Sequence, residues 1–366
     1  MGCVMDIVDP TGWLSGFHQR AAARRIPVTV HLELTRRCNL QCRHCYLGSQ
    51  AEQHAKRRME RDTEAVKRSI QEWMEAGCFH LVITGGDPMM REDFADIYRH
   101  AVGLGIFVTV FCDGILVTDR MLGLFREFPP RSVEISIYGA TAETYEKVTR
   151  VPGSHARAWQ GIRRLLDAGV RVVLKTVVLT LNQHELAAMA DQAREAGCAF
   201  HFDFAVFPCL PDHGSEPLDL RIAPEAAVAL DLSFPGRREK WAASIRKHQE
   251  REAGDALYAC GAGVTAFFAD PYGFVSPCLM TTQYRYPDRG RPFGEVWRDE
   301  LSEIRGRKRT RRGGCLDGNL RGACTHCPAF NYLETGDEEV DAPYMKRTAE
   351  LRYDAVMRGT PEECKP

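Results

Sequence analysis

The sequence has no long hydrophobic run and no excess of charge of either sign. A membrane-spanning helix needs about 18 or more consecutive apolar residues, and none of the apolar runs reaches that length. The 48 Lys and Arg side chains balance 49 Asp and Glu, for a net charge of −1. Bulk charge therefore gives no reason to expect nucleic acid or a membrane as partner. The opening residues, MGCVMDIVDP, lack the basic and apolar segments of a secretory signal, so we expect a cytoplasmic protein.

Cysteine, in contrast, is abundant, with 14 residues in a chain of 366. In a reducing compartment, clustered cysteines indicate metal ligands or catalytic thiols rather than disulfides. Three of them lie within residues 38–45, and five more lie within residues 260–327, four of them with recognisable spacing. These two groups carry most of the functional information in the sequence.

Six short apolar runs alternate with segments of helical period. The runs are residues 28–34, 79–86, 106–111, 133–139, 170–179 and 200–207. They are rich in β-branched and aromatic residues, as strands are, and Gly77, Gly169 and Gly197 stand where helices would end before a strand. Repeated strand–helix units predict a parallel sheet. A complete eightfold barrel needs about 250 residues and these units span roughly 180, so we predict an α/β fold: a partial (β/α)6 TIM-like barrel.

The composition changes along the chain and predicts further segments. We expect an N-terminal extension, the barrel, a linker with a helix, a small cysteine-rich α+β domain and a C-terminal tail, at residues 1–26, 27–207, 208–258, 259–345 and 346–366. The segment VTAFFADPYGFVSPC, residues 264–278, predicts a hairpin in the cysteine-rich domain.

The first cysteine group, Cys38-x3-Cys42-x2-Cys45, directly follows the first predicted strand. Active sites of α/β barrels lie at this carboxyl end of the strands. Thiolates favour iron–sulfur clusters or zinc, and a structural zinc site would be closed by four ligands. Three ligands leave a position open for chemistry, although a zinc site is an alternative at this point.

This loop resembles the signature of the radical S-adenosylmethionine (radical SAM) superfamily. The resemblance implies a [4Fe–4S] cluster on Cys38, Cys42 and Cys45, whose fourth iron binds the amino and carboxylate groups of S-adenosylmethionine. It also implies reductive cleavage of that cofactor to a 5′-deoxyadenosyl radical, which abstracts a substrate hydrogen atom. A reductant such as flavodoxin or ferredoxin would be a partner.

Other residues at predicted strand ends extend the resemblance. GGDP, residues 85–88, is similar to the Gly-Gly-Glu-Pro motif that meets the cofactor's amino group, with Asp87 one methylene shorter than the usual Glu. The resemblance places Ser136 near the ribose or carboxylate and His44 near the adenine. The residues it implies for cofactor binding are Gly85, Gly86, Asp87, Ser136, His44, Arg150 and Lys175.

The second cysteine group resembles the SPASM extension of peptide-modifying radical enzymes. Its spacing is Cys260-x12-Gly273-x4-Cys278, followed by the pair in CTHC, residues 324–327. A full SPASM domain continues with two more closely spaced cysteines, so this one is similar to the shortened twitch type. The resemblance implies one auxiliary [4Fe–4S] cluster on Cys260, Cys278, Cys324 and Cys327, with Cys315 as a spare ligand. A zinc ribbon is the alternative.

Three functions fit these features. Residues 133–170 are most similar to maturases that crosslink or oxidise a ribosomally made peptide. With about 26 residues before the barrel, we expect a separate peptide-recognition protein, or none. An oxidoreductase for a small molecule is the alternative, through dehydrogenation of an aminocyclitol or sugar alcohol, or a step of tetrapyrrole or cofactor biosynthesis. A non-enzymatic iron–sulfur or zinc-binding protein is disfavoured by GGDP and Ser136, because a carrier needs no cofactor pocket.

The remaining cysteines and a basic segment have simpler expected roles. Cys78 and Cys198 precede strands and are predicted to be core residues, whereas Cys112 and Cys209 follow strands and could face the substrate. The segment RGRKRTRR, residues 305–312, is predicted to be a solvated loop, and the acidic segment just downstream could neutralise it. The alternative is a patch for an acidic peptide or partner.

Overall fold

A computed structural model describes residues 10–210, 217–250, 254–288, 291–311, 314–324 and 327–358. The strands are β1 (Thr29–Thr35), β2 (His80–Gly85), β3 (Phe107–Cys112), β4 (Ser132–Ser136), β5 (Val172–Val177), β6 (Ala199–Asp203), β7 (Ala266–Ala269), β8 (Phe274–Ser276) and β9 (Tyr286–Pro287). The helices of the first half are α1 (Pro10–Arg24), α2 (Gln50–Ala55), α3 (Thr63–Glu75), α4 (Phe94–Gly103), α5 (Asp119–Glu127), α6 (Ala142–Thr149), α7 (Ser154–Asp167) and α8 (Leu186–Glu195). Those of the second half are α9 (Pro224–Ser233), α10 (Arg237–Gln249), α11 (Phe293–Arg298), α12 (Glu300–Gly306), α13 (Pro328–Thr335) and α14 (Pro343–Tyr353).

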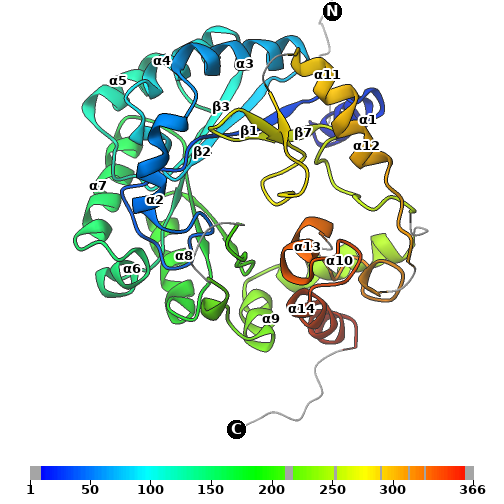
Figure 1. The fold of residues 1–366 in the computed structure, drawn as a ribbon. Coiled ribbons are helices and arrows are strands. Elements are labelled where there is room, and N and C mark those ends of the chain that lie inside the picture. The colour runs from blue at the N-terminus through cyan, green and yellow to red at the C-terminus, as the bar shows by residue number, and fades with distance from the viewer. Residues whose placement is uncertain are drawn as a thin grey trace, which may run out of the picture.

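The strands form one sheet in the order β6-β5-β4-β3-β2-β1-β7-β8-β9. All neighbours from β6 through β1 to β7 run parallel, and helices α3, α4, α5 and α7 cover the outside of the curved sheet (Figure 1). The predicted partial barrel is confirmed, and each of the six predicted runs overlaps one strand. The run 170–179 overshoots β5 because Leu179 is buried in a separate apolar cluster with Val206 and Leu220, beyond the end of the strand.

Helix α3 illustrates how the sequence determines these units. The side chain of Asp62 accepts a hydrogen bond from the backbone of Ala65 and caps its first turn. Val66, Ile70 and Trp73 are buried on one face, as the apolar period predicts. The chain leaves the helix through Gly77 at a φ of 111°, a conformation that side chains other than glycine rarely adopt.

The C-terminal part of the chain joins the same sheet. Strand β7 pairs in parallel with β1, and the predicted hairpin is present as the antiparallel pair of β7 and β8. The Phe267 ring of β7 lies 5.4 Å from that of Trp73 in α3 and 4.6 Å from that of Phe293 in α11. Arg61 and Asp288 form a buried ion pair at 2.9 Å beside them. This shared core fixes the cysteine-rich region against the barrel.

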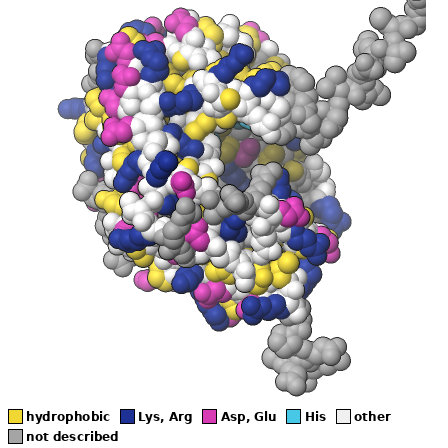
Figure 2. All heavy atoms as spheres, turned by 90° about the vertical axis from the view of Figure 1, so that its right-hand side faces the viewer, with side chains coloured by type: hydrophobic (Ala, Val, Ile, Leu, Met, Phe, Trp, Pro, Cys, Tyr) yellow, Lys and Arg dark blue, Asp and Glu magenta, His cyan; other side chains and the backbone are white. Residues whose placement is uncertain are grey.

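The basic segment is neutralised within the molecule. Arg311 pairs with Asp337 at 2.9 Å and Arg307 with Glu338 at 2.6 Å, as the sequence predicted. Figure 2 shows Lys and Arg side chains intermingled with Asp and Glu around a hollow in the face turned to the viewer. No helix in the described ranges is long and apolar enough to cross a membrane.

Candidate functional site

A cavity of about 260 Å³ lies at the carboxyl ends of β1 to β6. Each of the six strands or the loop after it contributes to the lining. The cavity brings together most of the residues singled out in the sequence, namely Cys38, Cys42, His44, Cys45, Gly85, Gly86, Ser136 and Lys175. Asp87 and Arg150 are not part of this lining.

The loop after β1 carries the three cysteines and is held from two sides. The backbone N–H of Cys38 donates to the side chain of Gln50 in α2 at 2.6 Å. The backbone N–H groups of Gln41 and Arg43 donate to carbonyls at the end of α6, both at 3.0 Å. All three cysteines are half-buried. An irregular loop with these anchors presents several thiols to one cavity.

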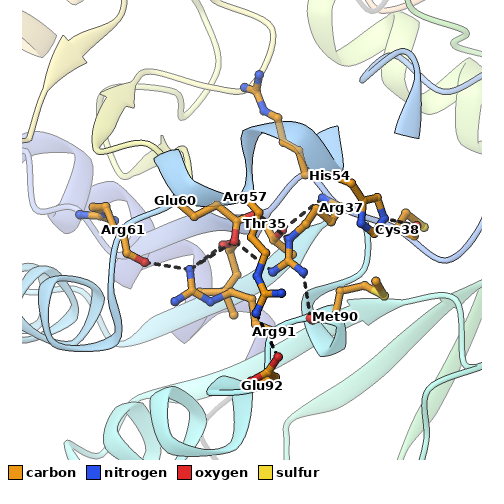
Figure 3. A network of polar contacts seen from close by, with 12 residues as sticks. Thr35, Arg37, Cys38, His54, Arg57, Glu60, Arg61, Met90, Arg91 and Glu92 are labelled. Atoms are coloured by element: carbon orange, nitrogen blue, oxygen red, sulfur yellow. Dashed lines mark hydrogen bonds and ion pairs between the residues drawn. The ribbon is translucent and has the colours of Figure 1, made fainter. Parts of the chain in front are cut away.

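A buried charge network supports the same loop (Figure 3). Arg37, directly before Cys38, donates through Nε and Nη2 to the two carboxylate oxygens of Glu60, each at 3.1 Å. The hydroxyl of Thr35, at the end of β1, also donates to Glu60. Arg91 approaches the same carboxylate to 3.9 Å. Sequence analysis missed this network, because Glu60 lies more than twenty positions from each of its partners and shares no motif with them.

The two glycines of GGDP allow the second loop to touch the first. The backbone N–H of Gly86 donates to the carbonyl of Thr35 at 2.8 Å. A Cβ on Gly85 would lie 2.1 Å from the Thr35 carbonyl oxygen, and one on Gly86 would lie 2.3 Å from that of Arg37. Any side chain at either position would therefore push the cysteine loop away.

The acidic residue of GGDP is completely buried and has protein partners. One oxygen of Asp87 accepts from the backbone N–H of Met89 at 2.8 Å, and the other accepts from that of Asp113 at 3.0 Å. Asp113 itself lines the cavity. Burial, followed by the negative charge of Asp87, raises the pKa of the Asp113 carboxyl well above its usual range. The sequence signal for Asp113 was available, because it is an acidic residue immediately after the third strand.

Two further residues of the cavity, His44 and Lys175, have lowered pKa values. The ring of His44 packs edge-on against Tyr138 at 4.8 Å, and burial lowers its pKa to about 4, so it is neutral. Lys175 lies 3.3 Å from a carboxylate oxygen of Glu134 and 2.9 Å from the centre of the Phe111 ring. Burial lowers the pKa of Lys175 to about 8.

Arg150 lies elsewhere. It is exposed and adopts a left-handed φ of 59° at the end of α6. Together with Cys42 and Cys45 it lines a separate cavity of about 350 Å³. Arg150 is thus adjacent to the cysteine loop without lining the 260 Å³ cavity.

The second cysteine group gathers beside the first cavity. A cavity of about 190 Å³ is lined by Cys315, Cys324 and Cys327. Its wall includes Ala205 and Phe207, which also line the 260 Å³ cavity. A hydrogen bond with Cys324, followed by burial, raises the pKa of the Cys315 thiol. The two groups of cysteines are therefore separated by a shared wall.

Cys278 and Cys260 lie near the same group. Burial above all, together with the neighbouring Cys327 and Cys260, raises the pKa of the Cys278 thiol to about 11. Cys260 is exposed. Cys260, Cys278 and Cys327 are thus neighbours, and Cys324 lies beside the buried Cys315.

The cysteines that line the 260 Å³ cavity are suitable ligands for an iron–sulfur cluster. Three thiols from one loop meet in an enclosed space, and burial raises the pKa of each, so their thiolate forms require a metal. Within the described ranges, no group of three or more His, Cys, Asp or Glu side chains is arranged to hold a single metal ion. A cubane cluster is ligated at separate iron atoms, one cysteine to each.

The other predicted cysteines divide as expected by position. Cys78 and Cys198 are buried at the opposite end of the strands. Cys112 lines the 260 Å³ cavity, and the Cys209 thiol lies 3.8 Å from the carbonyl oxygen of Cys45. The latter two therefore adjoin the candidate site.

Comparison with known proteins shows which families this part of the chain is similar to. The sequence profile of the radical SAM superfamily matches residues 32–193. An AdoMet-dependent heme synthase of Methanosarcina barkeri is 27% identical over 347 residues, which cover 88% of this chain and 97% of the relative. A PqqA peptide cyclase of Rhodopseudomonas palustris is 27% identical over 334 residues, or 85% and 81% of the two chains. The sporulation killing factor maturation protein SkfB of Bacillus subtilis is 24% identical, over 88% and 73%.

Solved structures share the architecture. SuiB of Streptococcus suis bound to its precursor peptide SuiA superposes with a TM-score of 0.69 at 14% identity, covering 94% of this chain and 83% of SuiB. anSMEcpe with bound AdoMet superposes with a TM-score of 0.67 at 12% identity, covering 91% and 96%. At such identities the likeness concerns the fold, which extends over the barrel and the C-terminal part together.

Proposed function

We propose that this chain is a radical SAM enzyme, which the match of residues 32–193 to the superfamily profile supports. It would abstract a hydrogen atom from a peptide held between the barrel and the cysteine-rich region. Cys38, Cys42 and Cys45 would hold a [4Fe–4S] cluster, which supplies the electron that cleaves S-adenosylmethionine. The observation that carries the proposal is that these three thiols share one cavity with Gly85, Gly86 and Ser136.

The residues around this cavity have distinct tasks in the proposal. The neutral ring of His44, packed on Tyr138, offers a flat surface for the adenine. Ser136 offers a hydroxyl to the ribose or carboxylate, and Lys175 offers a positive charge at neutral pH. The enclosing apolar side chains exclude water, which protects a reactive intermediate from quenching.

We assign an auxiliary [4Fe–4S] cluster to Cys260, Cys278, Cys324 and Cys327. Two of these residues, Cys324 and Cys327, line the 190 Å³ cavity, whose wall includes Ala205 and Phe207 of the 260 Å³ cavity. A substrate at this wall would lie between the two clusters. Such a position suits an oxidation, because the electron left after hydrogen abstraction needs an acceptor nearby.

The peptide assignment is supported by two relatives named as a peptide cyclase and a maturation protein. It has one competitor. The match to the heme synthase extends over 97% of that protein, against 81% and 73% for the two peptide enzymes. A tetrapyrrole is therefore the second candidate substrate.

The first test concerns the reaction itself. Anaerobically reconstituted, dithionite-reduced protein is incubated with S-adenosylmethionine, and 5′-deoxyadenosine is measured by liquid chromatography. The wild type and Cys78→Ala, which removes a buried core thiol, should form it, whereas Cys42→Ala should not. No product from the wild type, or equal amounts from both variants, would refute the proposal.

The second test separates the substrates. The reduced enzyme is offered, in parallel, a library of unstructured peptides and an iron porphyrin with propionate side chains. We expect loss of hydrogen from a peptide, detected by mass spectrometry. Conversion of the porphyrin with all peptides unchanged would reverse the assignment.

A further inference from the structure

Asp113 is a buried acid at the cavity that neither the motifs nor the comparisons assign. It directly follows β3, its residue is 5% exposed, and it lines the 260 Å³ cavity. Its Oδ1 accepts a hydrogen bond from the backbone N–H of Ile115 at 2.8 Å. Its Oδ2 is buried, and no group in the described part of the chain donates a hydrogen bond to it. A buried acceptor left in this state is costly, so this oxygen is available to a ligand.

Asp87, the acidic residue of GGDP, has no carboxylate oxygen without a hydrogen-bond partner. Both oxygens of Asp87 already accept backbone N–H groups, one of them from Asp113 itself, and Asp87 does not line the cavity. The hydrogen bond from Asp113 brings two carboxylates together in a buried place. Asn39, from the cysteine loop, also lies beside the Asp113 side chain. Two acidic groups thus lie close together at the wall between the cysteine loop and the ends of β2 and β3.

We propose that the carboxylate of Asp113, rather than that of Asp87, accepts the hydrogen bond from the amino group of S-adenosylmethionine, and that Asp87 positions it. This assignment rests on the proposed function. An amino group is the donor that the cofactor would present to a buried acceptor, and the resemblance already places that group beside GGDP. Because Asp87 is one methylene shorter than the usual Glu, the contact would be made by Asp113, which follows the neighbouring strand β3.

The test compares two ligands that differ only in the amino group, S-adenosylhomocysteine and its deaminated analogue. Dissociation constants are measured by equilibrium dialysis with the reconstituted holoenzyme. The wild type should prefer the amino-bearing ligand. Asp113→Asn keeps an acceptor for Ile115 and should lose roughly 10- to 100-fold of this preference, the worth of a hydrogen bond to a charged group. Asp113→Ser, which also keeps an acceptor for that turn, should do the same.

Asp119→Asn is the matched control, because its side chain is 98% exposed, and it should keep the wild-type preference. Full preference in both Asp113 variants would overturn the assignment while leaving the proposed function intact. A wild-type holoenzyme that binds neither ligand would overturn the proposed function and this assignment with it.

Discussion

The guanidinium of Arg37 donates two parallel hydrogen bonds to the carboxylate of Glu60, each 3.1 Å long. Both side chains are 7% exposed, so this is a buried, bidentate ion pair one residue before the first cysteine of the site. Because Arg37 also donates to the carbonyl of Met90 at 3.2 Å, the pair connects the cysteine loop with the loop that follows β2.

The first prediction concerns Glu60. Glu60→Gln leaves Arg37 without its countercharge, and breaking a buried pair in this way costs about 3–5 kcal/mol of unfolding free energy. We also expect the reconstituted cluster to be lost faster to an iron chelator, measured as the decay of its visible absorption, because the loop carrying Cys38 is released.

Glu92→Gln is the control for this prediction. Glu92 pairs with Arg57 at 3.0 Å in the same neighbourhood (Figure 3), but the two side chains are 86% and 60% exposed, and exposed pairs contribute little. Stability and chelator resistance should stay at wild-type levels. Equal effects of the two substitutions would show that the buried pair has no special role.

The second prediction concerns the pH dependence of cofactor binding. Burial lowers the pKa of Lys175 to about 8, so the ammonium is charged below pH 8 and becomes neutral as the pH rises through that value. If it faces the cofactor's carboxylate, the dissociation constant of S-adenosylmethionine should increase between pH 7 and pH 9.5.

In Lys175→Met this transition should be absent, with weak binding throughout. Lys67→Met serves as control, since Lys67 lies on the outer helix α3 and pairs with Glu64, and it should keep the wild-type profile. A transition near pH 8 that persists in Lys175→Met would assign the titration to another group.

The third prediction concerns the second cluster. The wild type should hold about eight irons per chain, as two [4Fe–4S] clusters require. Replacing Cys324 and Cys327 together by Ala should reduce this to about four. Replacing the buried core residues Cys78 and Cys198 together should leave it unchanged. About four irons in the wild type would remove the auxiliary cluster from the account.

Local patterns were enough to predict the strands and the cysteine loop, because alternation, helix period and close cysteine spacing are visible within a short window. Pairing of β7 with β1 was not predictable in this way, since the paired residues Thr29 and Ala266 are far apart in the sequence. Glu60 was missed for a related reason, because its role arises from burial and from partners on other elements. Asp113 could have been singled out as an acidic residue immediately after the third strand, but its burial and its contact with Asp87 are not visible in neighbouring residues.

Resemblance to a family reached further than local pattern, but it could not decide which side chain faces which cavity. It placed Asp87 and Arg150 at the cofactor. In the structure both oxygens of Asp87 have backbone partners, and Arg150 lines a separate cavity. Which cavity a side chain faces depends on its hydrogen-bond partners and on the backbone conformation, such as the left-handed turn at Arg150.

The central claim is that Cys38, Cys42 and Cys45 hold one iron–sulfur cluster. The most direct measurement is the visible absorption and iron content of oxygen-protected protein beside a variant with all three residues changed to Ala. We expect the wild type to show the broad absorption of a [4Fe–4S] protein and the variant to lose about four irons. An iron content and spectrum that are identical in the two proteins would contradict the account.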